Sequence, residues 1–132
     1  MRIFLFIIVS SFVINAQQYQ LNDPYPTASI TLEINFTVDK YYPIFGTSEK
    51  PHTSERLIKL TDRDGNYSAY LHFSNNYNSP QHNTRSKTLR FYYPDSYYDY
   101  IRIRLDNDEA FVVYREYKDG HKWGEIYFNK YP

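Results

Sequence analysis

Arginine and aromatic side chains recur along the last third of the chain, and these residue types suit binding more than catalysis. Aromatic rings supply rigid contact area, and guanidinium groups stack on them through cation–π interactions. Flat rings also fit the apolar faces of sugars, so the predicted ligand is a carbohydrate or a protein. The predicted ligand- or partner-binding residues are Tyr100, Arg102, Arg104, Phe111, Arg115, Tyr117, Trp123 and Tyr127.

Three strands are predicted to carry these residues, and their register decides which side chains share a face. A turn centred on Asn107-Asp108 pairs Leu105 with Ala110 and makes one face of the first two strands uniformly apolar. The strands are expected over residues 98–105, 110–117 and 122–128.

The second turn, Lys118-Asp119-Gly120, is predicted to be a three-residue loop with the glycine left-handed in a bulge. This register pairs Tyr114 with Gly124, where the missing side chain leaves room for the tyrosine ring, and it turns Trp123 outward. The outward face then carries the rows Arg104–Phe111–Tyr127, Arg102–Val113–Glu125, Tyr100–Arg115–Trp123 and Tyr98–Tyr117–His121. Two other interpretations stay open, because strands favour aromatic residues in any case and because another strand layer or a subunit can cover such a face.

Catalytic and metal-binding patterns are weak, so the sequence predicts neither an enzyme nor a cofactor nor a metal site. The four histidines, His52, His72, His82 and His121, do not have the spacing of zinc ligands. Glu116 and Glu125 would form the only plausible carboxylate pair for glycoside hydrolysis, but the predicted register puts them on opposite faces of the sheet. We expect Lys122 to balance Glu116, and Arg102 or Arg115 to balance Glu125.

Alternation of apolar and polar residues recurs through the rest of the chain and predicts strands. The clearest example is "SITLEINFTV", in which the apolar residues from Ile30 to Val38 occupy every second position. The other expected strands cover residues 56–60, 67–73 and 87–93, whereas 39–55 and 74–86 are expected to be loops. The predicted fold is all-β: a single-domain antiparallel β-sandwich of about seven strands, with a small β-barrel as the alternative.

The hairpin "LTDRDGNYSAYL", residues 60–71, is predicted to turn at Asp64-Gly65, which pairs Leu60 with Ala69. The same pairing sets Ile58 opposite Leu71. This hairpin resembles that of carboxypeptidase-regulatory-like and transthyretin-like domains, whose Thr-Asp-x-x-Gly-x-Tyr/Phe signature is matched by Thr61, Asp62, Gly65 and Tyr67. The resemblance implies a seven-stranded sandwich that serves as a non-catalytic module of an exported protein, and it implies no site residues.

The first 16 residues have the pattern of a secretory signal peptide: a positive start, an apolar run and a small residue at Ala16. The apolar run from Ile3 to Ile14 is too short to span a bilayer. We therefore expect a signal peptide over 1–16, an extended arm over 17–28 and the β-sandwich over 29–132, with no transmembrane segment. The location is secreted or extracytoplasmic, in the periplasm or cell envelope if the source is bacterial.

Composition limits the partners of the chain. The sequence has 15 basic and 15 acidic residues, and this balance argues against a nucleic-acid partner. It has no cysteine, so an exported domain would rely on its core without disulfides. The favoured hypothesis is an exported, non-catalytic binding module; the alternative is a structural envelope or matrix protein that self-associates, and a hydrolase is the least favoured.

Overall fold

The computed structural model describes residues 23–24, 26–46, 55–75 and 78–129. The predicted signal peptide and most of the predicted arm lie outside the described residues. Within the part of the chain that the structure describes, no helix is long and apolar enough to cross a membrane.

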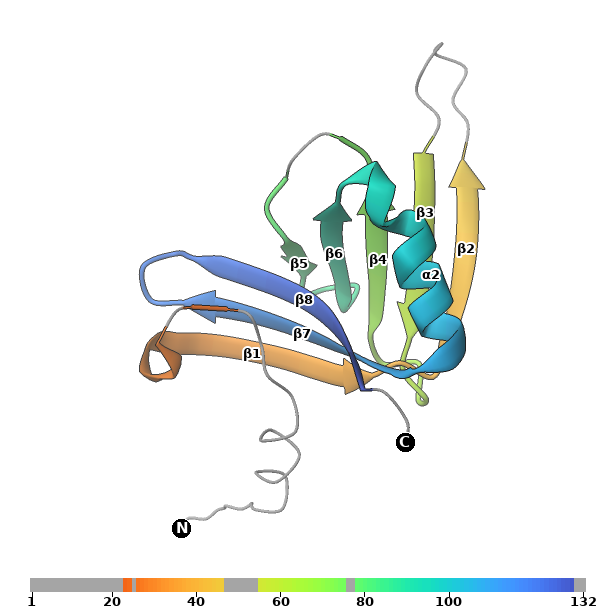
Figure 1. Cartoon of the computed structure of the whole chain (residues 1–132). Coiled ribbons are helices and arrows are strands. Elements are labelled where there is room, and N and C mark those ends of the chain that lie inside the picture. Colours follow the sequence, from red (N-terminus) through yellow and green to blue (C-terminus); the bar gives the residue numbers. More distant parts are fainter. Residues whose placement is uncertain (1–22, 25, 47–54, 76–77, 130–132) are drawn as a thin grey trace.

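The described residues form a three-stranded and a five-stranded sheet, whose strands cross one another steeply, and an α-helix, α2, that lies against the five-stranded sheet (Figure 1). The three-stranded sheet has the order β1-β7-β8 and the five-stranded sheet has the order β2-β3-β4-β6-β5. The elements are β1 (Ile30–Thr37), β2 (Lys40–Gly46), β3 (Glu55–Thr61), β4 (Ser68–Phe73), β5 (Gln81–Asn83), β6 (Thr88–Tyr93), α2 (Tyr98–Asn107), β7 (Glu109–Tyr117) and β8 (Lys122–Asn129), with short 3₁₀ turns at Thr27–Ser29 and Asp95–Tyr97.

The prediction of a β-rich fold with two sheets is confirmed, and four of its details are wrong. The described strands do not close a barrel. The fold is not all-β, because α2 replaces a predicted strand. It is not wholly antiparallel, because β4 and β6 pair in parallel. The segments 39–55 and 74–86, predicted as loops, contain the edge strands β2 and β5.

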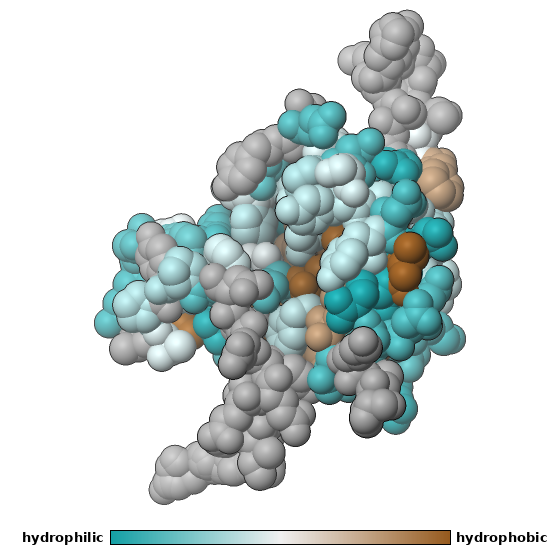
Figure 2. Space-filling view, viewed as in Figure 1, coloured by the Kyte–Doolittle hydropathy of each residue, from teal (hydrophilic) through white to brown (hydrophobic). Residues whose placement is uncertain are grey.

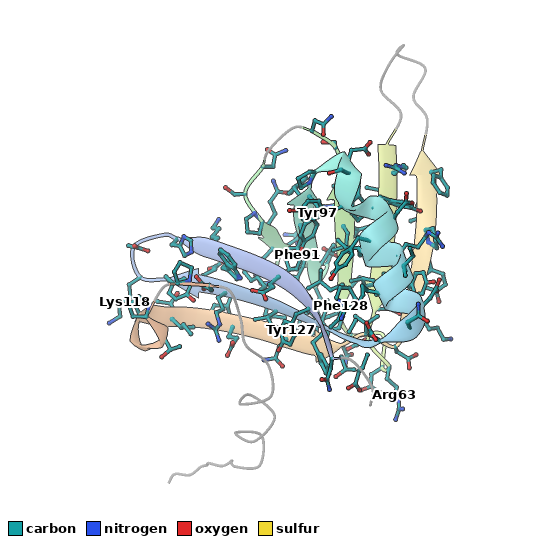
Figure 3. All side chains as sticks on the ribbon, in the orientation of Figure 1. Arg63, Phe91, Tyr97, Lys118, Tyr127 and Phe128 are labelled. Atoms are coloured by element: carbon teal, nitrogen blue, oxygen red, sulfur yellow. The ribbon has the colours of Figure 1, made fainter. Side chains whose placement is uncertain are left out.

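One face of each sheet is buried against the other, and the core lies between these two inner faces. The alternation predicted for β1 is confirmed, since Ile34 and Phe36 are buried while Glu33 and Asn35 are exposed. Phe91 on β6 lies between the two sheets (Figure 3). The core residues are Ile34, Phe36, Ile58, Leu60, Ala69, Leu71, Phe73, Leu89, Phe91, Tyr98, Ile101, Ala110, Val112, Tyr114 and Ile126.

Residues 98–105 form part of helix α2 because their apolar pattern also fits one face of a helix. Tyr98 and Ile101 are buried and Leu105 packs against the core, a spacing of three and then four residues. The predicted strand required Ile103 in the core as well, but that side chain is 51% exposed. The helix also places Asp99 in its first turn and Arg104 in its last. Each charge there interacts favourably with the helix dipole.

The helix is held on the five-stranded sheet by aromatic and charged contacts. The Tyr98 ring meets Phe73 of β4 edge-on, with 5.1 Å between ring centroids. The Arg56 guanidinium of β3 lies 4.2 Å from the Tyr98 ring centroid and donates a 2.7 Å hydrogen bond to Asp95. The predicted turn at Asn107-Asp108 is therefore wrong as a hairpin turn, since α2 ends at Asn107.

Both glycine turns have the predicted register. The Asp64-Gly65 turn pairs Ile58 with Leu71 and Leu60 with Ala69, and Gly65 has a φ of 71°.

At the β7–β8 turn, Gly120 has a φ of 92°, and Tyr114 pairs with Gly124 as predicted. The ring that fills the space above Gly124, however, is that of Phe91 rather than that of Tyr114. Gly124 thus lets the two sheets approach one another. The Ile126 backbone N–H adds a hydrogen bond of 3.3 Å to the Tyr93 hydroxyl across the same interface.

Candidate functional site

The predicted binding face is divided between the three-stranded sheet and the helix. Phe111, Arg115, Tyr117, Trp123 and Tyr127 lie on β7 and β8, whereas the other three predicted residues lie on α2. The first residue of each of the four predicted rows is therefore wrong. Residues 98–105 were expected to pair with β7, but β1 occupies that position. The residues displaced to the helix are Tyr100, Arg102 and Arg104.

Both arginines of α2 face acidic side chains four residues further along the chain. Arg102 lies 3.8 Å from Asp106, and Arg104 forms an ion pair with Asp108. The Arg104 guanidinium also donates a 2.7 Å hydrogen bond to the Tyr100 hydroxyl. The Arg104 guanidinium also lies 4.9 Å from the ring centroid of Phe128 on β8, a residue that packs against the core. These contacts hold the helix in place and do not involve the predicted binding residues of β7 and β8. The side of the molecule seen in Figure 2 is mainly hydrophilic and has only small apolar patches.

Side chains on the outer face of the three-stranded sheet contact one another. Arg115 donates a 2.8 Å hydrogen bond to Glu33 of β1. The Phe111 and Tyr127 rings lie 5.6 Å apart, and Phe111 is 9% exposed. Arg115 and Phe111 are therefore less accessible than an open binding face requires.

Trp123 lies on this outer face, as the register predicted, and is half-buried. Its indole N–H donates a 2.8 Å hydrogen bond to Glu125. The expected partners of Glu125, Arg102 and Arg115, were therefore wrong. Glu116 lies opposite Lys122 as predicted, and it also accepts a 2.6 Å hydrogen bond from the Tyr114 hydroxyl.

Asp23, which belongs to the predicted arm, adds a further contact to this face. The Asp23 side chain is fully buried, accepts a hydrogen bond from the Tyr117 hydroxyl, and lies 3.5 Å from His121 Nε2. Burial raises the pKa of Tyr117, and the hydrogen bond to Asp23 raises it further. The carboxylate therefore fastens the arm onto the end of β7 and β8.

The outer face of the five-stranded sheet has the chemistry that was predicted for the other sheet. Its middle row crosses all five strands and alternates aromatic with cationic side chains before ending in an amide. Tyr42, at the β2 edge, is 46% exposed. The row consists of Tyr42, Lys59, Tyr70, Arg90 and Gln81. We call these five residues the outer row.

Cation–π contacts organise the centre of the outer row. The Arg90 guanidinium lies 4.7 Å from the Tyr70 ring centroid on one side, and Lys59 Nζ lies 5.8 Å from it on the other. A cation beside a ring face contributes about 0.5–1 kcal/mol at an exposed site. The Tyr70 ring is therefore contacted by one cation from each neighbouring strand.

A second row braces the Arg90 side chain. The His72 ring stacks on Tyr92 at 4.7 Å, and its Nε2 lies 2.8 Å from the Arg90 guanidinium. The Tyr92 hydroxyl in turn donates a 3.3 Å hydrogen bond to Gln81 of β5. The guanidinium and the edge amide are thus positioned by the same pair of rings.

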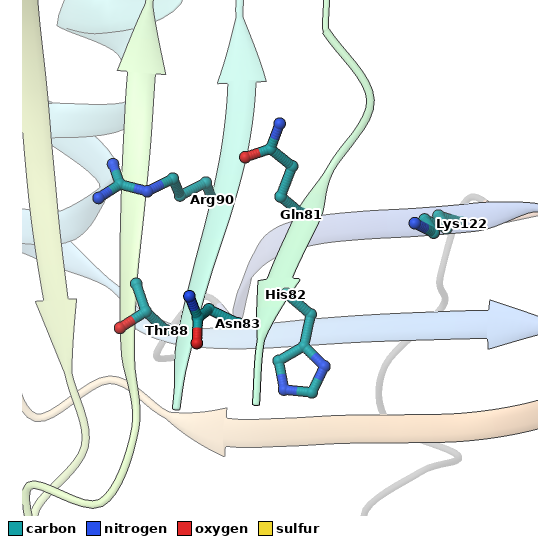
Figure 4. A pocket seen from close by; sticks show the side chains of 6 residues that line it. All are labelled: Gln81, His82, Asn83, Thr88, Arg90 and Lys122. Atoms are coloured by element: carbon teal, nitrogen blue, oxygen red, sulfur yellow. The ribbon is translucent and has the colours of Figure 1, made fainter. Parts of the chain in front are cut away.

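A shallow polar hollow of about 320 Å³ lies where the outer row reaches the β5 edge (Figure 4). Arg90 extends from β6 across β4, and Lys122 of β8 stands on the far side of the hollow (Figure 4). The His82 ring is 5.5 Å from that of Tyr114 on β7. The lining residues are Gln81, His82, Asn83, Thr88, Arg90 and Lys122.

This region of the surface is positively charged. The outer row is flanked by the rows Lys40–Thr61–Ser68–Thr88–Asn83 and Ile44–Leu57–His72–Tyr92. These three rows and the hollow lining include the cations Lys40, Lys59, Arg90 and Lys122 and not a single carboxylate. An anionic or polyhydroxylated ligand would therefore meet donors and aromatic rings along these rows.

Among the described residues, no three His, Asp or Glu side chains gather closely enough to hold a metal ion. Comparisons with protein-family models, curated proteins and solved structures found no match to this chain. The chemistry of the side chains is therefore the basis for assigning a function.

Sequence reasoning missed the outer row for identifiable reasons. Tyr42 and Gln81 lie in segments predicted as loops, and strand order is a long-range property that the sequence did not reveal. One signal was available: Lys59, Tyr70 and Arg90 each lie next to a core residue of an alternating strand. Their outward direction followed from that alternation, although their alignment in one row did not.

Proposed function

We propose that this protein is an exported, non-catalytic module that binds a polysaccharide chain along the outer row. The leader pattern of residues 1–16 supports export. The single observation behind the proposed ligand is the unbroken sequence of aromatic, cationic and amide side chains across five strands.

The outer row has dimensions and chemistry that suit an extended sugar polymer. Strands in a sheet are spaced by about 4.8 Å, so five strands extend the row over about 19 Å. Tyr42, which is exposed at the β2 edge, can stack on the apolar face of a sugar ring, because aromatic faces bind flat apolar surfaces. Tyr70 has cations over its ring and instead holds Lys59 and Arg90 in place as donors. Lys59 and Arg90 can donate hydrogen bonds to the hydroxyl or acidic groups of the sugar chain.

The row is also prearranged, which favours binding. Lys59 and Arg90 hold Tyr70 from both sides, and His72 holds Arg90. A side chain that is already fixed loses less conformational entropy when a ligand arrives. The donors and rings therefore need little rearrangement on binding.

Calorimetric titration with soluble polysaccharides tests the proposal directly. The panel is a glucan, a mannan and a polygalacturonate, and we expect at least one to bind. Tyr70→Leu should weaken that binding about fivefold, because it removes the ring that holds Lys59 and Arg90, and a cation–π contact contributes about 0.5–1 kcal/mol. Lys59→Gln should weaken it by a similar factor.

Matched controls lie elsewhere on the molecule. Tyr100→Leu removes an exposed tyrosine from α2, and Arg63→Gln removes an exposed cation from the β3–β4 turn, which Figure 3 shows far from the hollow. Both controls should bind like the parent protein. The proposal fails if no member of the panel binds, or if the controls lose as much affinity as the outer-row variants.

A further inference from the structure

The hollow at the β5 edge has an unusual balance of hydrogen-bonding groups, because the oxygens of its two amides are already occupied. Asn83 Oδ1 accepts hydrogen bonds from the backbone N–H groups of Arg85 and Ser86, at 3.0 and 3.1 Å. Gln81 Oε1 accepts the Tyr92 hydroxyl at 3.3 Å. Both amide nitrogens therefore remain as donors toward a ligand.

The other polar groups of the hollow extend the same pattern. Lys122 contributes an exposed ammonium from β8, whereas the Arg90 guanidinium lies over Tyr70 and beside His72, so Arg90 lines the hollow with its stem. The Thr88 hydroxyl already donates to the Ser86 carbonyl at 3.3 Å. The lining thus combines the positive charge of Lys122 with two amide donors whose own oxygens already accept hydrogen bonds.

We infer that this hollow is a carboxylate subsite, which takes the acid group of a uronic acid unit in the polysaccharide. The inference rests on the proposed function for its ligand, because the hollow continues the outer row at Arg90 and Gln81. A carboxylate has acceptor oxygens only, and it meets the paired donors that the lining presents.

One carboxylate close to the hollow would repel a bound anion, and its removal provides a test. Glu116 stands opposite Lys122 in the β7–β8 ladder, although it is not part of the lining. Its Oε2 accepts the Tyr114 hydroxyl at 2.6 Å. Removing its charge should strengthen the attraction of the hollow for an anion, whereas removing the charge of Lys122 should weaken it.

The test compares methyl glucuronide with methyl glucoside, which share a pyranose ring and differ in a carboxylate against a hydroxymethyl group. Titration is followed in amide NMR spectra through residues 81–83 and 88–90. The glucuronide should bind about fivefold more tightly, because hydrogen bonds to a charged group are stronger than neutral ones. Lys122→Gln should remove most of this preference, and Glu116→Gln should increase it.

The outcomes separate the two proposals. Equal affinities of the parent protein for the two sugars would overturn the carboxylate subsite, as would a preference that Lys122→Gln leaves intact. Polysaccharide binding that depends on Tyr70 would still support the proposed function in that case. Glucuronide selectivity at residues 81–83, with no polysaccharide bound along the outer row, would support the subsite and overturn the proposed function.

Discussion

Replacing Gly124 by alanine tests the packing that joins the two sheets. A Cβ atom at this position would lie 2.4 Å from Cε1 and 2.5 Å from Cδ1 of Phe91. Carbon atoms pack at about 3.5–4.0 Å, so the ring would have to move by more than about 1 Å. Phe91 is only 2% exposed and the neighbouring Tyr114 is fully buried, so the surrounding core leaves little space for that movement.

The expected cost is at the upper end of the range for overpacked cores, about 3 kcal/mol of unfolding free energy. This is a large part of the 5–15 kcal/mol that typically stabilises a domain. Urea unfolding at neutral pH measures it, with the fluorescence of Trp123, the only tryptophan, as the signal.

A double-mutant cycle identifies the cause. Phe91→Leu makes the ring smaller, so Gly124→Ala should cost at least about 1 kcal/mol less in its presence than in the parent protein. Gly120→Ala is the control, because a Cβ there meets nothing within 4 Å and its cost arises from a φ of +92°. Additive effects of Gly124→Ala and Phe91→Leu, or a Gly124→Ala cost below about 0.5 kcal/mol, would refute the reasoning.

Two further predictions concern polar groups. Burial raises the pKa of the Tyr114 hydroxyl, and its hydrogen bond to Glu116 raises it further. The stability that Tyr114 contributes is therefore complete below the ordinary tyrosine pKa of about 10 and is lost as the pH rises toward the folded value. Tyr114→Phe should lose less stability than the parent between about pH 9 and pH 11 in urea titrations, and an identical loss would contradict this. Asp23→Asn should cost about 1–2 kcal/mol, since a buried charge-assisted bond to Tyr117 is weakened. It should also change the emission of Trp123, whose ring lies 6.3 Å from His121; unchanged stability and emission would show that Asp23 does not fasten the arm.

Local features of the sequence predicted the local structure well. The glycines at 65 and 120 adopt positive φ values and set the two hairpin registers that were expected. The alternation from Ile34 to Phe36 gave the correct buried face of β1. These signals depend on neighbours within a few residues, where steric and hydrophobic preferences act directly.

Long-range arrangement was predicted less well. Ile101, Ile103 and Leu105 fit a strand by alternation, but Ile101 and Leu105 together with Tyr98 also fit one helix face, and contact with Phe73 favours the helix. The insertion of β1 beside β7 and the parallel pairing of β4 with β6 depend on tertiary packing that no local pattern encodes. The outer row could not be predicted for the same reason, since its alignment depends on the order of five strands.

The most direct test of the account is to map a bound galacturonan fragment by amide NMR on the protein. We predict that the largest shift changes occur at Lys59, Tyr70 and Arg90 on the outer face of the five-stranded sheet. Changes centred on Arg115 and Trp123, on the outer face of the three-stranded sheet, would contradict the account.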